Sequence, residues 1–258
     1  MKRLSIIIPA HNEEKRIGYT LEKYCNFFKK SKENNVLDFE ILIVINNTRD
    51  ETEKIVQEFQ NEFPEILYLN FGRGGKGFAI VEGFKDALRR NNDLIGFVDA
   101  DCSTPPEAFY DLIKYIGNAD GSIANRRDKR SKVTPHPILR RILSRGGNFI
   151  IRSLFLLPHR DTQCGAKLFK RELIEKVYPK LGSSEWSFDI DLLFYARREK
   201  AKIKSIPTVW IAKDGSHINL KKTPITVLLS VIRLRLIHSP FNFVIRVYRK
   251  LPDKLKFH

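Results

Sequence analysis

Short apolar runs alternate with longer amphipathic segments through the first hundred residues. Four runs rich in Ile, Leu, Val and Phe have the length of buried strands, and they lie at residues 4–9, 39–45, 66–70 and 94–98. Three segments between them show helical spacing, at residues 12–30, 51–62 and 78–90. Strand and helix therefore alternate, which predicts an α/β fold with a mostly parallel sheet flanked by helices.

Polar turns follow three of these predicted strands. They are His11–Glu13, Asn46–Asp50 and Asp99–Asp101, and a glycine-rich loop lies at Gly72–Gly77. We expect Asn12, Glu13 and Glu14 to cap the helix that runs to about residue 30, with acids in its first turn. The carboxyl ends of parallel strands share one edge of a sheet, where such folds bind ligands. The three turns therefore predict a functional rim.

The pattern changes after residue 120. Basic loops surround a predicted helix at residues 139–157, and a further helix at 188–198 precedes a strand at 204–211. The sequence contains no internal repeat and no linker before residue 220. These features predict a catalytic domain over residues 1–220 and a separate segment over residues 221–258.

The charge of the chain is unevenly distributed. The total of 46 Lys and Arg against 30 Asp and Glu gives a net charge of +16. Residues 221–258 hold nine bases and one acid, a net +8, and residues 126–145 hold eight bases and one acid, a net +7. Such patches favour anionic partners such as nucleic acids, membrane surfaces or phosphorylated substrates. In residues 221–258 the bases alternate with apolar residues, which favours a membrane surface and no nucleic acid.

Composition narrows the class of protein. A content of 42% hydrophobic and 11% aromatic residues excludes a disordered chain. The three cysteines, Cys25, Cys102 and Cys164, form no CxxC pair, which argues against a zinc ribbon or disulfide scaffold and indicates a reducing compartment. The apolar stretch at residues 225–237 is interrupted by Arg233 and Arg235, so no spanning helix is predicted. We expect a cytoplasmic protein, peripherally associated with a membrane.

The triplet Asp99-Ala100-Asp101 directly follows a predicted buried strand. Two carboxylates one residue apart can bind one hard divalent cation such as Mg²⁺ or Mn²⁺. A cation held in this way neutralises a diphosphate as it leaves. The triplet therefore makes both aspartates candidate metal ligands.

An ordered series of motifs resembles the GT-A family 2 glycosyltransferases, and it extends over about residues 4–240. The motifs are Ser5–Glu14, Gly75–Gly77, Asp99–Asp101, Arg141–Phe149, Arg160–Phe169, Trp186–Leu193, Ile206–Trp210 and Asp214–His217. The segments Arg160–Phe169 and Trp186–Leu193 resemble the dolichyl-phosphate glucosyltransferases more closely than the mannosyl branch. The resemblance implies a GT-A, Rossmann-like fold with a basic amphipathic C-terminal extension.

The activity that this resemblance implies is an inverting sugar transfer. Glucose would move from UDP-glucose to dolichyl phosphate, or a related polyprenyl phosphate, at the cytoplasmic face of a membrane, with a divalent cation. The acceptor phosphate is already an anion, so no general base is needed to create the nucleophile. The reaction needs electrostatic stabilisation of the acceptor and the leaving diphosphate.

The resemblance also implies which residues contact the nucleotide-sugar donor. Pro9, His11 and Glu13 match the loop that binds base and ribose, while Asp99 and Asp101 match the diphosphate and metal site. The remaining donor-side matches are Lys76, Gln163 and Asn46. The family usually has two consecutive Asp where this chain has Ile45-Asn46. An Asn oxygen still accepts a hydrogen bond from a base but supplies no charge.

On the acceptor side, arginine suits a phosphate because its planar fork holds two oxygens. Arg126 and Arg141 match the family's arginines for this task. Asp189 and Asp191 match an acidic pair near the acceptor, where one of them would orient the sugar or an arginine. With Asp101, these four residues form the predicted catalytic set.

Several alternatives remain open at this point. GDP-mannose could replace UDP-glucose as donor, because the Ile45-Asn46 loop departs from the family pattern. A sugar hydroxyl acceptor would need a general base, for which Asp189 or Asp191 is the candidate. A nucleic-acid-binding protein would explain the net charge but not Asp99, Asp101 or the ordered motifs. A non-catalytic nucleotide-sugar-binding protein would bind the donor without turnover.

Overall fold

The computed structural model describes most of the 258 residues. The residues outside the description are 136–137, 183–187, 213–230, 232–233, 237–238 and 240–258. Contacts within the chain divide it into two units, one formed by Met1–Pro135 with His159–Ser216 and the other by His136–Pro158 with His217–His258. The predicted C-terminal extension lies mostly outside the described residues, and the boundary near residue 220 stays a prediction.

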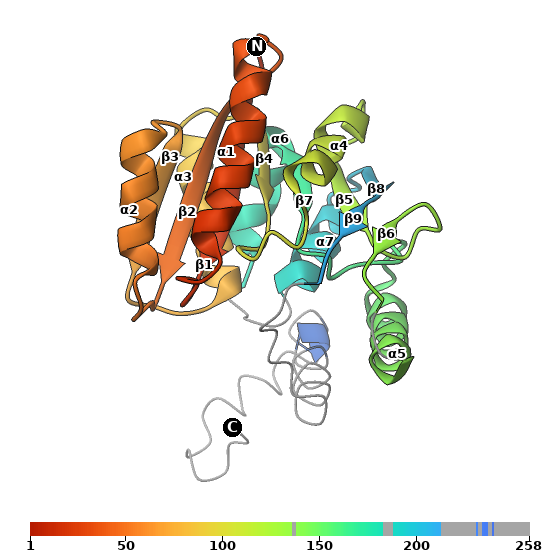
Figure 1. The fold of residues 1–258 in the computed structure, drawn as a ribbon. Helices are drawn as coiled ribbons and strands as arrows, with labels where there is room; N and C mark the ends of the chain where they lie inside the picture. Colours follow the sequence, from red (N-terminus) through yellow and green to blue (C-terminus); the bar gives the residue numbers. More distant parts are fainter. Residues whose placement is uncertain (136–137, 183–187, 213–230, 232–233, 237–238, 240–258) are drawn as a thin grey trace. The chain divides into compact units, whose positions relative to one another are not determined.

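The first unit is built on a seven-stranded sheet with the order β3-β2-β1-β4-β7-β5-β8 (Figure 1). Its strands are β1 (Arg3–Ala10), β2 (Asp38–Asn46), β3 (Ile66–Phe71), β4 (Leu94–Phe97), β5 (Gly121–Asn125), β7 (Lys167–Lys170) and β8 (Ile203–Pro207). Strand β7 runs antiparallel to β4 and β5, and the other neighbours are parallel. The prediction of a mostly parallel α/β sheet is confirmed.

Helices cover both faces of this sheet. On the near face in Figure 1 lie α1 (Ile17–Glu33), α2 (Thr52–Glu62) and α4 (Pro106–Ile116). The far face carries α3 (Lys76–Arg89), α6 (Arg171–Val177) and α7 (Phe188–Arg198). The 3₁₀ turn η1 (Tyr178–Lys180) contacts α3 and α6. A small parallel pair is formed by β6 (Lys132–Val133) and β9 (Val209–Trp210). In the second unit, α5 spans Ile138–Phe155, close to the predicted 139–157.

Two aromatic clusters fill the spaces between the sheet and its helices. One joins the rings of Tyr24, Phe28 and Phe109, and the other joins Phe84, Phe97 and Phe188. All six side chains are buried. Because β1, β2 and β4 are covered on both faces, their sequences read as continuous apolar runs rather than as alternating ones.

Some element predictions are wrong. Helix α1 begins at Ile17, and no acid lies in its first turn. Asn12 instead adopts a left-handed φ of 54°, and the Glu13 carbonyl accepts the amides of Arg16 and Ile17. The predicted strand at 204–211 divides at Thr208, whose amide donates to the Ser131 hydroxyl. The pattern of the chain also did not predict α4, α6, β5, β6 or β7.

Candidate active site

A cavity of about 230 Å³ lies at the carboxyl edge of the sheet. Its lining comes from the ends of β1, β2 and β4 and from the start of α3: Pro9, His11, Glu13, Asn46, Lys76, Asp99, Ala100 and Asp101. The structure therefore brings together every residue predicted for the donor side except Gln163, which is exposed and is not among the lining residues. The predicted rim of polar turns is present as one cavity.

Hydrogen bonds interlock the turn after β1 with the turn after β2. The Asn12 amide donates to Thr48 Oγ1 at 3.3 Å, and the Arg49 amide donates to Asn12 Oδ1 at 2.9 Å. The Glu13 amide also donates to Thr52 Oγ1 at 2.8 Å. These bonds hold one wall of the cavity in place without using the side chain of Glu13 or His11.

Asn46 connects three segments around the cavity. Its Nδ2 donates to the Ala10 carbonyl at 2.8 Å, and its Oδ1 accepts the Gly75 amide at 3.0 Å. Its own carbonyl lies 2.8 Å from Nδ1 of His11. Both polar atoms of the side chain are thus bonded to the backbone, so Asn46 positions the loops around it. Gly75 has a φ of 124°, a conformation that favours glycine, where the loop turns into α3.

Glu13 lines the cavity as one half of an ion pair. Arg16 donates to both carboxylate oxygens, at 2.7 and 2.9 Å. Burial raises the pKa of Glu13, Arg16 opposes this shift, and the nearby charges of Asp101 and Asp99 add to it. The carboxylate is therefore held in a fixed orientation at the cavity wall, where a sugar hydroxyl could donate to it.

Asp99 and Lys76 form an ion pair inside the cavity. Burial favours a higher pKa for Asp99, but the charges of Lys76, Lys167 and Arg126 outweigh it and lower that pKa. Burial likewise opposes the charge on Lys76, but Asp99 and Asp189 raise the pKa of its ammonium. Both groups are therefore charged at neutral pH, so the cavity offers an ammonium and carboxylates side by side.

The donor set of the cavity fits a divalent cation that also binds a diphosphate. Asp101 lies beside Asp99, and its Oδ1 accepts the Ser103 amide at 2.9 Å. Among the described residues, no group of three or more His, Cys, Asp or Glu could hold a metal ion. Mg²⁺ is commonly bound by one or two carboxylates together with substrate phosphates and water. Asp99 and Asp101 supply those carboxylates.

Gly165 packs directly against the carboxylate of Asp99. A Cβ built on this glycine would lie 1.8 Å from Asp99 Oδ2, so no other residue leaves room for the carboxylate. Gly165 lies two residues after Gln163, within the motif Arg160–Phe169, and the sequence alone does not indicate its contact with Asp99. The requirement for glycine here comes from close approach, not from backbone conformation.

The predicted acceptor residue Arg126 is bonded to a residue that the sequence analysis missed. Its amide, Nε and Nη2 donate to Asp161 at 3.0, 2.8 and 2.9 Å. The guanidinium carbon also lies 5.7 Å from the ring centroid of Trp210. Asp161 is buried, and its position in the quoted motif Arg160–Phe169 is the signal that could have identified it.

The remaining predicted catalytic residues do not line the cavity. Asp189 is paired with Lys167, and Asp191 is buried and accepts the Gly182 amide at 2.9 Å. Arg141 is exposed on α5, which belongs to the other unit. Among the described residues, Asp189 and Asp191 are thus absent from the cavity lining, although the charge of Asp189 raises the pKa of Lys76.

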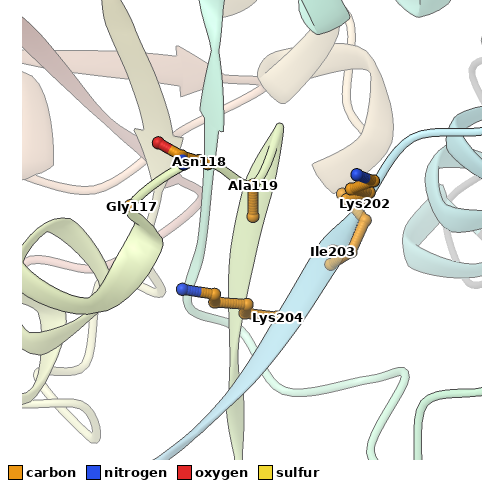
Figure 2. A pocket seen from close by; sticks show the side chains of 6 residues that line it. All are labelled: Gly117, Asn118, Ala119, Lys202, Ile203 and Lys204. Atoms are coloured by element: carbon orange, nitrogen blue, oxygen red, sulfur yellow. The ribbon is translucent and has the colours of Figure 1, made fainter.

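A second hollow lies at the opposite, amino edge of the sheet, before β5 and β8. It has a volume of about 690 Å³ and is lined by Gly117, Asn118, Ala119, Lys202, Ile203 and Lys204 (Figure 2). Figure 2 shows the Lys204 side chain extending from β8 toward the loop before β5, and its ammonium donates to the Tyr115 carbonyl at 3.0 Å. No predicted site residue lines this hollow.

Comparison with known proteins identifies the family. Residues 5–178 match the model of Glycosyl transferase family 2. A dolichyl-phosphate beta-glucosyltransferase of Trichomonas vaginalis is 33% identical over 252 residues, which cover 94% of this chain and 76% of that protein. The enzymes of the same name from Dictyostelium discoideum and Homo sapiens are 29% and 28% identical, covering 95% and 84% of this chain and 76% and 70% of those proteins.

Solved structures support the same fold. Glucosyl-3-phosphoglycerate synthase from Mycobacterium tuberculosis, in complex with Mn²⁺, UDP and glucosyl-3-phosphoglycerate, superposes with a TM-score of 0.64 at 15% identity, covering 91% of this chain and 80% of that chain. Mannosyl-3-phosphoglycerate synthase from Rubrobacter xylanophilus gives 0.62 at 15% identity, covering 93% and 76%. The GT-A-like fold is confirmed. With the family model and the relatives of similar sequence, it establishes that this chain is a glycosyltransferase and belongs to glycosyl transferase family 2.

Proposed function

We propose that this glycosyltransferase moves glucose from UDP-glucose to dolichyl phosphate or a related polyprenyl phosphate, with inversion. The observation that carries the proposal is the single cavity that gathers Glu13, Lys76, Asp99 and Asp101 at one edge of the sheet. The relatives named dolichyl-phosphate beta-glucosyltransferase support the choice of donor and acceptor.

Charges in the cavity suit the departure of a nucleoside diphosphate. A divalent cation held by Asp99 and Asp101 would neutralise charge on the leaving diphosphate. Lys76 supplies a second positive charge, and fixed charges of this kind stabilise a transition state without reorganisation. His11 and Glu13 lie along the same wall, where they would contact the base and the ribose.

The acceptor side of the proposal needs arginines and no general base. A phosphate monoester is already a nucleophilic anion. Asp189 is paired with Lys167 and Asp191 bonds to the Gly182 amide, which supports an acceptor that needs no proton removed. We assign the acceptor phosphate to Arg126, which is oriented by Asp161. Arg141, on α5, is a separate candidate that the family resemblance supplies.

Helix α5 and the basic C-terminal segment suit a membrane surface. The helix contains four arginines and no acid, and its apolar residues Phe149, Ile150 and Leu154 are exposed. Apolar side chains combined with bases bind the interface of anionic bilayers. Among the helices that the structure describes, none has the length and apolar content needed to cross a bilayer. From the exposed apolar and basic residues of α5, we propose peripheral docking at the cytoplasmic face of a membrane.

A donor screen tests the proposed reaction. Purified protein is mixed with Mn²⁺ or Mg²⁺, a polyprenyl phosphate and radiolabelled UDP-glucose or GDP-mannose, and the label that enters the lipid phase is counted. We expect label from UDP-glucose, and its loss in Asp101→Ala. Asp111→Ala, on α4 and outside the cavity lining, is the matched control and should retain activity.

Two other results of this screen would contradict the proposed reaction. Label from GDP-mannose alone would reject glucose transfer and indicate the mannosyl reaction. Binding of UDP-glucose without label in the lipid would indicate another acceptor or a non-catalytic nucleotide-sugar-binding protein.

A further inference from the structure

A buried ion pair lies outside the cavity lining. Lys167, on β7, has no exposed surface, and the side chain of Asp189, at the start of α7, is 16% exposed. The Lys167 Nζ donates to Asp189 Oδ1 at 2.5 Å. Lysine is rarely buried completely, because removing its charge from water is unfavourable unless a partner compensates. Because neither residue lines the cavity, contact with a ligand there does not explain why this ion pair is buried.

The ammonium of Lys167 has a second partner. It donates to the Cys164 carbonyl at 2.6 Å and lies 5.3 Å from the ring centroid of Phe97. Phe97 is the residue opposite Lys167 in the pairing of β4 with β7. One side chain thus connects α7 to the backbone that enters β7.

That backbone forms the support of Asp99. Gly165 directly follows Cys164, and a Cβ on Gly165 would lie 1.8 Å from Oδ2 and 2.3 Å from Cγ of Asp99. Lys76 forms an ion pair with Asp99 through Oδ1. The carboxylate is held between an ammonium and a backbone segment, so its position depends on where residues 164–165 lie.

We propose that Lys167 and Asp189 are positioning residues for Asp99. Their ion pair fixes the backbone of Cys164 and Gly165, and that backbone fixes the carboxylate at the diphosphate end of the cavity. The inference rests on the proposed function, which assigns Asp99 to the diphosphate and its cation. It also replaces an acceptor-side role for Asp189 with a role on the donor side.

A purely structural role can be separated from positioning by experiment. Removing one member of a buried ion pair destabilises a protein, whereas replacing both with apolar residues of similar size is often neutral or stabilising. The double variant Lys167→Met/Asp189→Leu therefore keeps the interior filled and removes the link to the Cys164 carbonyl. Lys167→Arg keeps the positive charge at this position, so it tests whether that charge preserves the affinity for UDP with Mn²⁺.

The control is an exposed ion pair in the same unit. Lys180, in η1, and Glu199, just after α7, lie 2.6 Å apart and do not line the cavity. The matched variant is Lys180→Met/Glu199→Leu. For each protein we would measure the thermal midpoint, the affinity for UDP with Mn²⁺ by calorimetry, and kcat and KM for UDP-glucose.

We expect Lys167→Met alone to lower the thermal midpoint and the double variant to recover it. The affinity for UDP with Mn²⁺ should nevertheless fall about 10- to 100-fold in the double variant, the range observed when supporting partners of a metal site are removed. In the same double variant, KM for UDP-glucose should rise. Lys167→Arg should recover part of the affinity, and the control should match the wild type.

Two different results would overturn two different claims. A folded double variant that binds UDP and Mn²⁺ with wild-type affinity would overturn the positioning role alone. A wild-type chain that binds neither UDP nor UDP-glucose with Mn²⁺ would overturn the proposed function on which the inference rests.

Discussion

At the scale of single residues, the lack of a side chain at Gly165 leaves the space that the Asp99 carboxylate occupies. We expect Gly165→Ala to lower transferase activity by about 100-fold, the loss that a displacement of about 1 Å in a reacting group can cause. The reason is that the new Cβ would occupy the space of Asp99 Oδ2. The measurement is kcat/KM for UDP-glucose.

The matched control for that variant is Gly18→Ala on α1. Its Cβ would make ordinary contacts of 3.5 and 3.6 Å with Phe59 and Ile55. Activity should stay at the wild-type level. Equal losses of activity in the two variants would show that Gly165 has no special relation to Asp99.

Asp161 gives a second prediction at this scale, for stability rather than activity. Burial favours a higher pKa for Asp161, but the hydrogen bonds and charge of Arg126 outweigh it and lower that pKa. The ionised pair therefore stabilises the fold above pH 3.8, the ordinary pKa of an aspartate, and this contribution is lost as the pH falls through the lower folded value.

Asp161→Asn should therefore reduce the free energy of unfolding by about 3–5 kcal/mol at pH 7. The difference from the wild type should shrink progressively below pH 3.8, as urea unfolding measured in steps from pH 7 to about pH 2 would show. Asp128→Asn, which removes the charge that pairs with the exposed Arg130, should change stability little. A difference that is independent of pH would contradict this account.

The sequence predicted the donor-side residues better than the residues that support them. Glu13, Asp99 and Asp101 lie in polar turns at strand ends, where the pattern of the chain marks a rim and the family resemblance supplies their roles. Asp161 and Lys167 act through partners 35 and 22 residues away, and such contacts depend on how β5, β7 and α7 assemble. The spacing of residues along the sequence does not indicate which of these elements pack together.

At the scale of elements, α3 packs closely against β1 at Gly83. A Cβ on Gly83 would lie 2.6 Å from Cγ2 of the buried Ile7. We expect Gly83→Ala to destabilise the fold by about 1–3 kcal/mol, because overpacking forces the helix away from the sheet. UDP affinity should also fall, since α3 begins at Lys76. Chemical denaturation and calorimetry would measure the two effects.

The double variant Gly83→Ala/Ile7→Ala tests the cause. Removing the Ile7 side chain leaves room for the new Cβ, so the double variant should be less destabilised than the sum of the single variants. If the losses in the free energy of unfolding of the two single variants simply add, the contact between the new Cβ and Ile7 is not the cause.

Element predictions succeeded where the apolar residues of a segment are continuous or follow a clear period. Strands β1, β2 and β3 and helix α7 follow the predicted ranges closely. Strand β5 reads GSIAN and β7 reads KLFK, and neither is a continuous apolar run. The sheet recruits both strands through pairing with distant partners, and this tertiary context overrides weak local preference.

At the scale of the whole molecule, the net charge of +16 predicts salt-sensitive binding to anionic vesicles. Residues 240–258, which lie outside the described residues, hold five Lys or Arg and one Asp. Each base near an anionic surface contributes about 1 kcal/mol, so deleting residues 240–258 should weaken vesicle association at least about tenfold. Cosedimentation with vesicles containing phosphatidylserine would measure this.

The deletion has two internal controls. Affinity for UDP should not change, because the cavity residues all lie in the unit formed by residues 1–135 and 159–216. Binding to uncharged vesicles should be weak for both proteins. If vesicle association survives the deletion unchanged, the C-terminal segment is not a docking device.

The division into two units also bears on how the chain is made. The second unit combines residues 136–158 with residues 217–258, and residues 159–216 of the first unit lie between them. Ribosomes add about 5–20 residues per second, so about 3–12 s separate synthesis of the two segments. During that interval α5 has been made, with Phe149, Ile150 and Leu154 among its apolar residues, and residues 217–258 have not. A bilayer or a chaperone that covers α5 during translation should therefore raise the yield of folded protein.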